Sequence, residues 1–273
     1  MKAASATLER REAPEGARIA AVRAMGRDIR RRPTLIDRLI ALLADGSESA
    51  KLRLEALDVL QGATFLVQTF AAKRPQYLEA LRSIMDDPDR DLRRRVIGAL
   101  AREKDEYVHR RLLEGLEKPS KALVPPAKAI QFLGYDVHAD YFPLLRRIVE
   151  QPPTASAQRE AIRVLAADPK SRPLLTKILG DKDQPSGVRY MSALALQSLA
   201  PTQFEGIARK IALDNREDHR LRAASLTALA QYTEPQATAS QRAFTRRVEK
   251  LGERASSPDV KRATKAYMAR VRG

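Results

Sequence analysis

The chain has 273 residues, of which 44% are hydrophobic and 31% charged, a composition typical of an ordered protein. It contains no cysteine, which excludes disulfides, thiolate nucleophiles and cysteine-based zinc sites. The net charge of +16 indicates either an acidic partner or an Arg-rich solubilising surface. No stretch approaches the ~18 apolar residues of a membrane span, and residues 1–16 lack the apolar core of a signal peptide, so we expect a cytoplasmic protein.

One short pattern recurs along the chain. It places an apolar residue at i, a basic residue at i+1, a small residue at i+4 and an apolar residue at i+8. Positions i, i+4 and i+8 lie within about 80° on one helix face, so each instance predicts a helix with a packed stripe. In chain order the instances, with the i+1 residue second, are Ala17, Arg18, Ala21, Met25; Leu52, Arg53, Ala56, Leu60; Leu92, Arg93, Val96, Leu100; Pro125, Pro126, Ala129, Leu133; Ala157, Gln158, Ala161, Leu165; Val188, Arg189, Ser192, Leu196; Leu221, Arg222, Ser225, Leu229; and Val260, Lys261, Thr264, Met268.

A second set of amphipathic stretches alternates with these helices, at residues 35–43, 77–85, 108–116, 141–149, 174–179, 204–213 and 244–251. Successive instances of the pattern begin 31 to 40 residues apart. A near-constant period of this length, built from pairs of helices, is typical of an α-solenoid. We therefore predict an all-α solenoid of about seven to eight helix pairs that forms one domain over residues 1–273.

Three segments depart from the repeat. Residues 1–13 are expected to form an N-terminal cap. The longest step contains Phe65, Leu66, Val67 and Phe70, which indicate a lengthened second helix. Residues 233–240 (TEPQATAS) read as a polar loop, because they combine proline with small and polar residues.

The turn followed by Val-Arg-x-x-Ala-x-x-x-Leu resembles the HEAT repeat family, in particular its bacterial short-repeat branch of the phycobilisome-lyase type, over residues 14–270. The resemblance implies a right-handed superhelix whose Val-Arg helices line the concave face. It also implies that the arginine at i+1 pairs with an acidic residue six positions earlier. The corresponding pairs are Glu12–Arg18, Asp87–Arg93 and Asp183–Arg189, whereas Ser47 and Arg216 stand at that position before Arg53 and Arg222.

The positions opposite the packed stripe, near i+2, i+3, i+6, i+10 and i+13, are candidates for a binding surface on that concave face. Many of them are cationic, and guanidinium groups can grip carboxylates or follow a phosphate backbone. The candidate residues are Arg23, Arg27, Arg30, Arg94, Arg95, Arg102, Lys128, Arg159, Arg163, Tyr190, Arg262 and Arg270.

These features predict a non-enzymatic scaffold whose basic concave face engages an acidic partner, foremost a protein. The alternative is a nucleic-acid binder that contacts phosphates through the same residues. A more distant alternative is an enzyme similar to the helical-repeat alkylpurine DNA glycosylases, although the chain has no Trp. No His-Glu pair of the HEAT-like di-iron hydroxylases and no phosphate-loop or nucleophile-elbow motif occurs, so we predict no catalytic residue, metal, cofactor or small-molecule substrate.

Overall fold

The computed structural model describes residues 2–138, 140–232 and 239–272, with side chains over 5–138, 140–231 and 240–272. These parts of the chain form seventeen α-helices and contain no β-strand, which confirms the predicted all-α solenoid of helix pairs. Contacts divide the chain into two units, Met1–Ala139 and Asp140–Gly273. A single domain over 1–273 stays a prediction. Over the same described residues, no helix is both long and apolar enough to cross a membrane.

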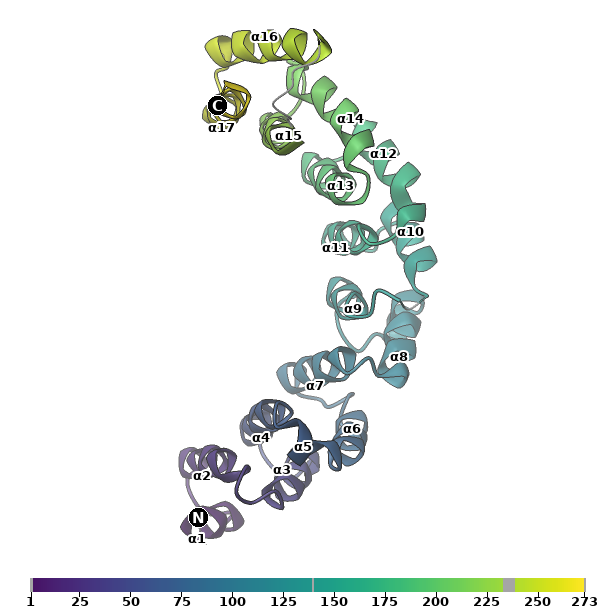
Figure 1. Ribbon diagram of the computed structural model, residues 1–273. Coiled ribbons are helices and arrows are strands. Elements are labelled where there is room, and N and C mark those ends of the chain that lie inside the picture. Colours follow the sequence, from purple (N-terminus) through teal and green to yellow (C-terminus); the bar gives the residue numbers. More distant parts are fainter. Residues whose placement is uncertain (1, 139, 233–238, 273) are drawn as a thin grey trace. The chain divides into compact units, whose positions relative to one another are not determined.

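The N-terminal unit stacks its helices in two layers (Figure 1). The inner layer consists of helices that carry the packed stripe, and the outer layer covers them; α1 packs on α2 before the first pair. A five-residue helix, α5, connects α4 to α6. The helices are α1 (Lys2–Glu9), α2 (Glu15–Asp28), α3 (Leu35–Ala44), α4 (Ala50–Ala63), α5 (Val67–Ala71), α6 (Arg74–Ser83), α7 (Arg90–Arg102), α8 (Glu106–Glu117) and α9 (Pro126–Leu133), with α2, α4, α7 and α9 in the inner layer.

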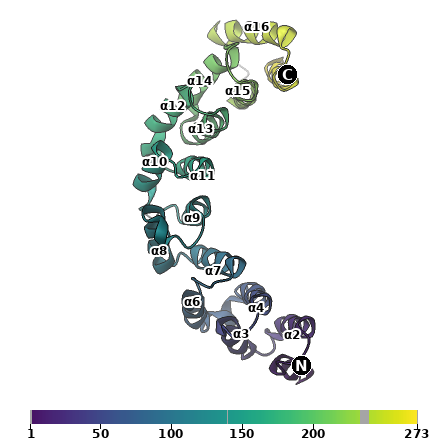
Figure 2. The ribbon, with the colours of Figure 1, turned by 180° about the vertical axis from the view of Figure 1, so that it is seen from behind.

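The C-terminal unit repeats this arrangement, and the view from behind shows the same two layers (Figure 2). Successive inner helices contact one another from α11 to α17. The expected inner and outer helices are present in each unit, apart from the lengthening predicted at residues 65–70. The helices of this unit are α10 (Phe142–Glu150), α11 (Ala155–Leu165), α12 (Arg172–Gly180), α13 (Ser186–Leu199), α14 (Pro201–Leu213), α15 (His219–Tyr232), α16 (Ala239–Arg254) and α17 (Pro258–Arg272), with α11, α13, α15 and α17 in the inner layer.

The predicted stripe is the core of both units. All of its positions are buried except Ala17 and Pro125, which are exposed, and Met268, which is half-buried. Ala17 lies in the first turn of α2 and Pro125 directly precedes α9, so both stand where the helix has barely begun. The small residues at i+4 are among the most buried, which allows neighbouring helices to approach closely.

The structure tests one of the two predictions about residues 65–70 and 233–240. The lengthened second helix is wrong, because α4 ends at Ala63 and the separate α5 follows. Phe70 of α5 is buried against Tyr77, whereas Phe65 and Val67 are exposed. Most of the predicted loop 233–240 lies outside the described residues, and Ala239 and Ser240 begin α16.

The residue at i+1 is buried in most inner helices and caps the helix before it. Each of these side chains donates to the carbonyl of the next-to-last residue of the preceding outer helix or cap, at 2.9–3.3 Å, and so satisfies one of the orphan carbonyls at that helix end. The donors are Arg18, Arg53, Gln158, Arg189 and Arg222, and the acceptors are Leu8, Leu43, Val149, Leu179 and Ala212.

The ion pairs implied by the family resemblance are wrong in this chain. The arginines reach forward to the turn of the next repeat, because the guanidinium lies between two successive turns and not above its own. The observed pairs are Arg18–Glu48, Arg53–Asp87 and Arg189–Glu217, each at 2.6 Å, while Arg93 donates to the backbone carbonyls of Asp87 and Leu123. Glu12 and Asp183 form no ion pair with these arginines.

Candidate functional site: a groove on the inner layer of the C-terminal unit

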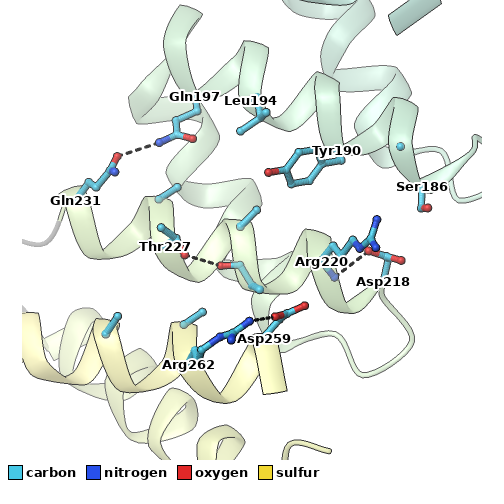
Figure 3. A pocket seen from close by; sticks show the side chains of 16 residues that line it. Ser186, Tyr190, Leu194, Gln197, Asp218, Arg220, Thr227, Gln231, Asp259 and Arg262 are labelled. Atoms are coloured by element: carbon cyan, nitrogen blue, oxygen red, sulfur yellow. Dashed lines mark hydrogen bonds and ion pairs between the residues drawn. The ribbon is translucent and has the colours of Figure 1, made fainter. Parts of the chain in front are cut away.

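A groove of about 840 Å³ opens on the inner layer of the C-terminal unit. Three successive inner helices, α13, α15 and α17, form its walls and floor, as the close-up in Figure 3 shows. All of these helices belong to the same unit and contact one another in sequence. The groove is therefore a property of the helix stacking within that unit.

The floor of the groove is built from residues with almost no side chain, notably Gly187, Ala223, Ala224, Ala263 and Ala266. Small side chains on adjacent helices leave the helix surfaces low and close together, so the space above them stays open. Such a floor suits the approach of another backbone or of a bulky apolar side chain.

Two large apolar side chains stand beside this floor. Tyr190 and Leu194 are 36% and 39% exposed, and Figure 3 shows them projecting from α13 beside α15. Their i and i+4 spacing places them on the same face of the helix. An exposed aromatic–aliphatic pair at a concave surface is a typical anchor site for a partner.

The polar residues of the groove lie at its two ends. At one end the Gln197 side-chain amide Nε2 donates to Gln231 Oε1 at 3.0 Å, which links α13 to α15. At the other end Asp218 caps α15, and Asp259 pairs with Arg262 in the first turns of α17. The ionised lining residues are two carboxylates and two guanidinium groups, so the groove as a whole is not strongly basic.

Arg220 is the cation of the groove with the most freedom to bind. It is exposed on α15, and its guanidinium forms no ion pair or side-chain hydrogen bond with the part of the chain that the structure describes. Its backbone N–H donates to Asp218 at 2.9 Å, so the main chain at this position is held while the side chain is available. An incoming carboxylate can accept two hydrogen bonds from such a group.

The structure distributes the twelve predicted binding residues over both units and brings two of them, Tyr190 and Arg262, into the groove. Several others are engaged by carboxylates. Arg23 makes two hydrogen bonds of 2.8 Å to Glu55, which raise the pKa of Arg23, and Arg95 pairs with Asp58. The acidic residues of α4 thus neutralise cations on both neighbouring inner helices.

The remaining predicted residues divide into two groups. Arg94 and Arg163 pair with carboxylates three positions earlier on their own helices, and Lys128 donates to Gln131 at 2.6 Å and lies over the Phe132 ring. A second group is exposed and forms no ion pair or side-chain hydrogen bond within the described residues. This group consists of Arg27, Arg30, Arg102, Arg159 and Arg270.

Selection by charge missed most of the groove. The positions i+2, i+3, i+6 and i+10 of the last three inner helices include Tyr190, Leu194, Ala223, Ala224, Thr227, Gln231, Arg262, Ala263 and Ala266, all of which line it. The helical register of these positions therefore predicts the groove lining, whereas positive charge alone does not identify its small and apolar residues. Arg220 and Gln197 stand outside this register.

Within the described residues, no group of three or more His, Asp or Glu side chains is arranged to hold a metal ion. The chain matches no protein-family model and no curated protein sequence. Among solved structures it is similar to human deoxyhypusine hydroxylase in complex with glycerol, at 13% identity and a TM-score of 0.39, over 88% of this chain and 96% of that one. It is also similar to the complex of CpcE and CpcF of phycocyanin lyase from Nostoc sp., at 18% identity and a TM-score of 0.28, over 99% and 94% of the two chains.

Proposed function

We propose that this protein is a non-enzymatic HEAT-like scaffold of the short-repeat kind that binds a segment of a protein partner in the groove of α13, α15 and α17. The observation that carries the proposal is the exposed Tyr190–Leu194 pair above a floor of glycine and alanine. A surface of this kind buries apolar side chains of a partner at a site that the chain itself leaves uncovered.

The groove fits an amphipathic helix with an acidic flank. Apolar side chains of the partner would pack on Tyr190 and Leu194 in the helix-in-groove mode, spaced at i, i+3 or i+4. A carboxylate on the same segment would accept hydrogen bonds from Arg220, whose guanidinium has no ion pair within the described residues. An acidic residue in the partner is thus expected because of the single contact with Arg220, and not because of a continuous row of cations.

A direct test is to select amphipathic helical peptides from a display library on the full chain. The enriched peptides should carry Asp or Glu beside apolar anchors. The double substitution Tyr190→Ala with Leu194→Ala should weaken them by at least about 30-fold, the effect of losing a hot spot of ~2 kcal/mol. Fluorescence polarisation measures this loss.

The matched control is Phe65→Ala with Val67→Ala, because these two side chains are also apolar and exposed but lie in the other unit. It should leave peptide affinity unchanged. Peptides that bind the Tyr190 and Leu194 variant as tightly as the original chain would show that the groove is not the binding site. Arg220→Gln should reduce affinity only for the acidic peptides.

A further inference from the structure

Arg222, in the C-terminal unit, is a buried arginine that lacks the carboxylate partner of Arg18, Arg53 and Arg189. Arg18, Arg53 and Arg189 each receive a carboxylate from the turn before the next inner helix. Arg222 is equally buried, at 5% exposure, but the turn before α17 is Ala255-Ser256-Ser257. This turn offers no carboxylate.

The register of the repeat identifies the missing group. Glu48 and Glu217 stand four residues before the first stripe positions Leu52 and Leu221. Four residues before Val260, the equivalent position, is Ser256. Asp87, the partner of Arg53, stands five residues before Leu92, and the position five residues before Val260 is Ala255. The turn before α17 thus has no acidic side chain at either of the positions that supply a carboxylate to Arg18, Arg53 and Arg189.

The remaining partners of Arg222 are weak. Its Nε donates to the Ala212 carbonyl at 3.3 Å and its Nη2 to Asn215 at 3.2 Å, and it forms no ion pair within the described chain. Burial lowers the pKa of Arg222, with the negative charges of Asp214 and Glu217 opposing that effect. Those two carboxylates are already paired, with Lys182 and Arg189 respectively.

A cavity of about 500 Å³ opens at Arg222. Three cations of α16, namely Arg247, Lys250 and Arg254, line it together with the side chains of His219 and Ser256. No carboxylate belongs to the lining, and none of these three cations forms an ion pair with the described residues. We call this cavity, defined by Arg222, Arg247, Lys250, Arg254 and Ser256, the Arg222 pocket.

We propose that the Arg222 pocket binds a phosphate group, which takes the place of the carboxylate that pairs with Arg18, Arg53 and Arg189. Four cations and no carboxylate line the pocket, so a dianion is favoured over a single carboxylate. Ser256 adds a hydroxyl donor, and the first turn of α17, which reaches the pocket at Val260, adds the positive end of a helix. The volume accommodates a phosphate together with the substituent of a monoester. This site is separate from the groove and does not depend on the function proposed for it.

The test compares the full chain in millimolar phosphate with the same chain in sodium acetate or chloride at equal ionic strength. Phosphate should raise the Tm by at least about 2 °C. Isothermal titration with inorganic phosphate and with O-phosphoserine then shows which source of the phosphate group binds more tightly. An equal Tm in acetate or chloride would overturn the proposal.

Two variants make the result specific. Lys250→Gln with Arg254→Gln should weaken phosphate binding at least tenfold, whereas Arg246→Gln with Lys265→Gln, which removes the same charge from exposed positions outside the pocket, should not. Ser256→Glu restores the glutamate of the repeat, so it should raise the Tm without phosphate and abolish the phosphate effect. Undiminished phosphate binding by both pocket variants would contradict the assignment.

Discussion

Three hydroxyl groups at the i+4 position of the stripe are buried without a hydrogen-bond partner among the described residues: Ser192, Ser225 and Thr264. The position requires a small side chain, and a serine meets that requirement at the cost of an unsatisfied hydroxyl. An unpaired buried polar group typically costs about 1–3 kcal/mol.

Ser192→Ala and Ser225→Ala should therefore each raise the free energy of unfolding by about 1 kcal/mol, as measured by urea denaturation. Ser198→Ala is the control, because Ser198 is exposed on the same helix as Ser192 and reports the change in helix propensity alone. A gain in the control as large as that at Ser192 would show that the buried hydroxyl is satisfied.

The forward ion pairs make stability depend on pH. The hydrogen bond from Arg18 holds the pKa of Glu48 below its ordinary value of 4.5, although burial opposes this. A carboxylate with a lowered folded pKa contributes stability that is present above its unfolded pKa and is lost as the pH falls through the folded value. Stability should therefore decline as the pH falls below 4.5.

Glu48→Gln should remove this part of the pH dependence and destabilise the protein by about 3 kcal/mol near neutral pH, because it leaves Arg18 buried without its charge partner. The Arg23–Glu55 pair offers a control, since Arg23 is 63% exposed and Glu55→Gln should cost much less than Glu48→Gln. Equal losses for the two variants would mean that burial does not decide the strength of these pairs. Urea denaturation at several pH values measures both.

At the scale of the helix, two glycines differ in what surrounds them. A Cβ at Gly115 of α8 would lie 2.9 Å from the Cα of Ala122, which is backbone and cannot move aside alone. A Cβ at Gly206 of α14 would meet nothing within 4 Å. Gly115 is therefore required because the chain passes close to it at Ala122 on its way to α9, whereas packing does not require a glycine at position 206.

We expect Gly115→Ala to lower the free energy of unfolding by about 1–3 kcal/mol through overpacking. Gly206→Ala should raise it by up to about 1 kcal/mol through helix propensity. Thermal unfolding followed by far-UV circular dichroism compares the two. A stabilised Gly115→Ala variant would show that the turn after α8 relaxes at little cost.

At the scale of the whole molecule, the net charge of +16 comes from cations spread over the chain and not from one site. Exposed cations such as Arg27, Arg30 and Arg102 lead us to expect a general affinity for polyanions. We expect weak binding to duplex DNA and RNA that falls steeply with salt, because each neutralised phosphate releases condensed counterions. Fluorescence anisotropy at two salt concentrations measures this dependence.

The same experiment separates the two functional readings. Binding to nucleic acid should be unaffected by Tyr190→Ala with Leu194→Ala, since the groove holds equal numbers of acidic and basic side chains. Tight binding that persists near physiological salt and is lost in this variant would favour the nucleic-acid alternative over a protein partner.

The helices and their buried stripes could be predicted from the chain alone, because they depend on spacings of four and eight residues within one helix. Leu92, Val96 and Leu100 are buried because their spacing places them on one face of α7, and this spacing can be read from the thirteen residues of that helix. The helix predicted from the apolar residues at 65–70 was wrong, because a short turn divides this apolar run and exposes Phe65.

Contacts between repeats depended on the tertiary structure. Arg18 pairs with Glu48, thirty residues ahead, and not with Glu12, because stacking decides which turn lies beside the guanidinium. The groove likewise exists only where three helices pack with their small residues together. The lack of a carboxylate partner for Arg222 can be recognised only by comparison with the ion pairs of Arg18, Arg53 and Arg189. Spacing within a helix is a local property of the backbone, whereas the distance between successive turns is set by packing.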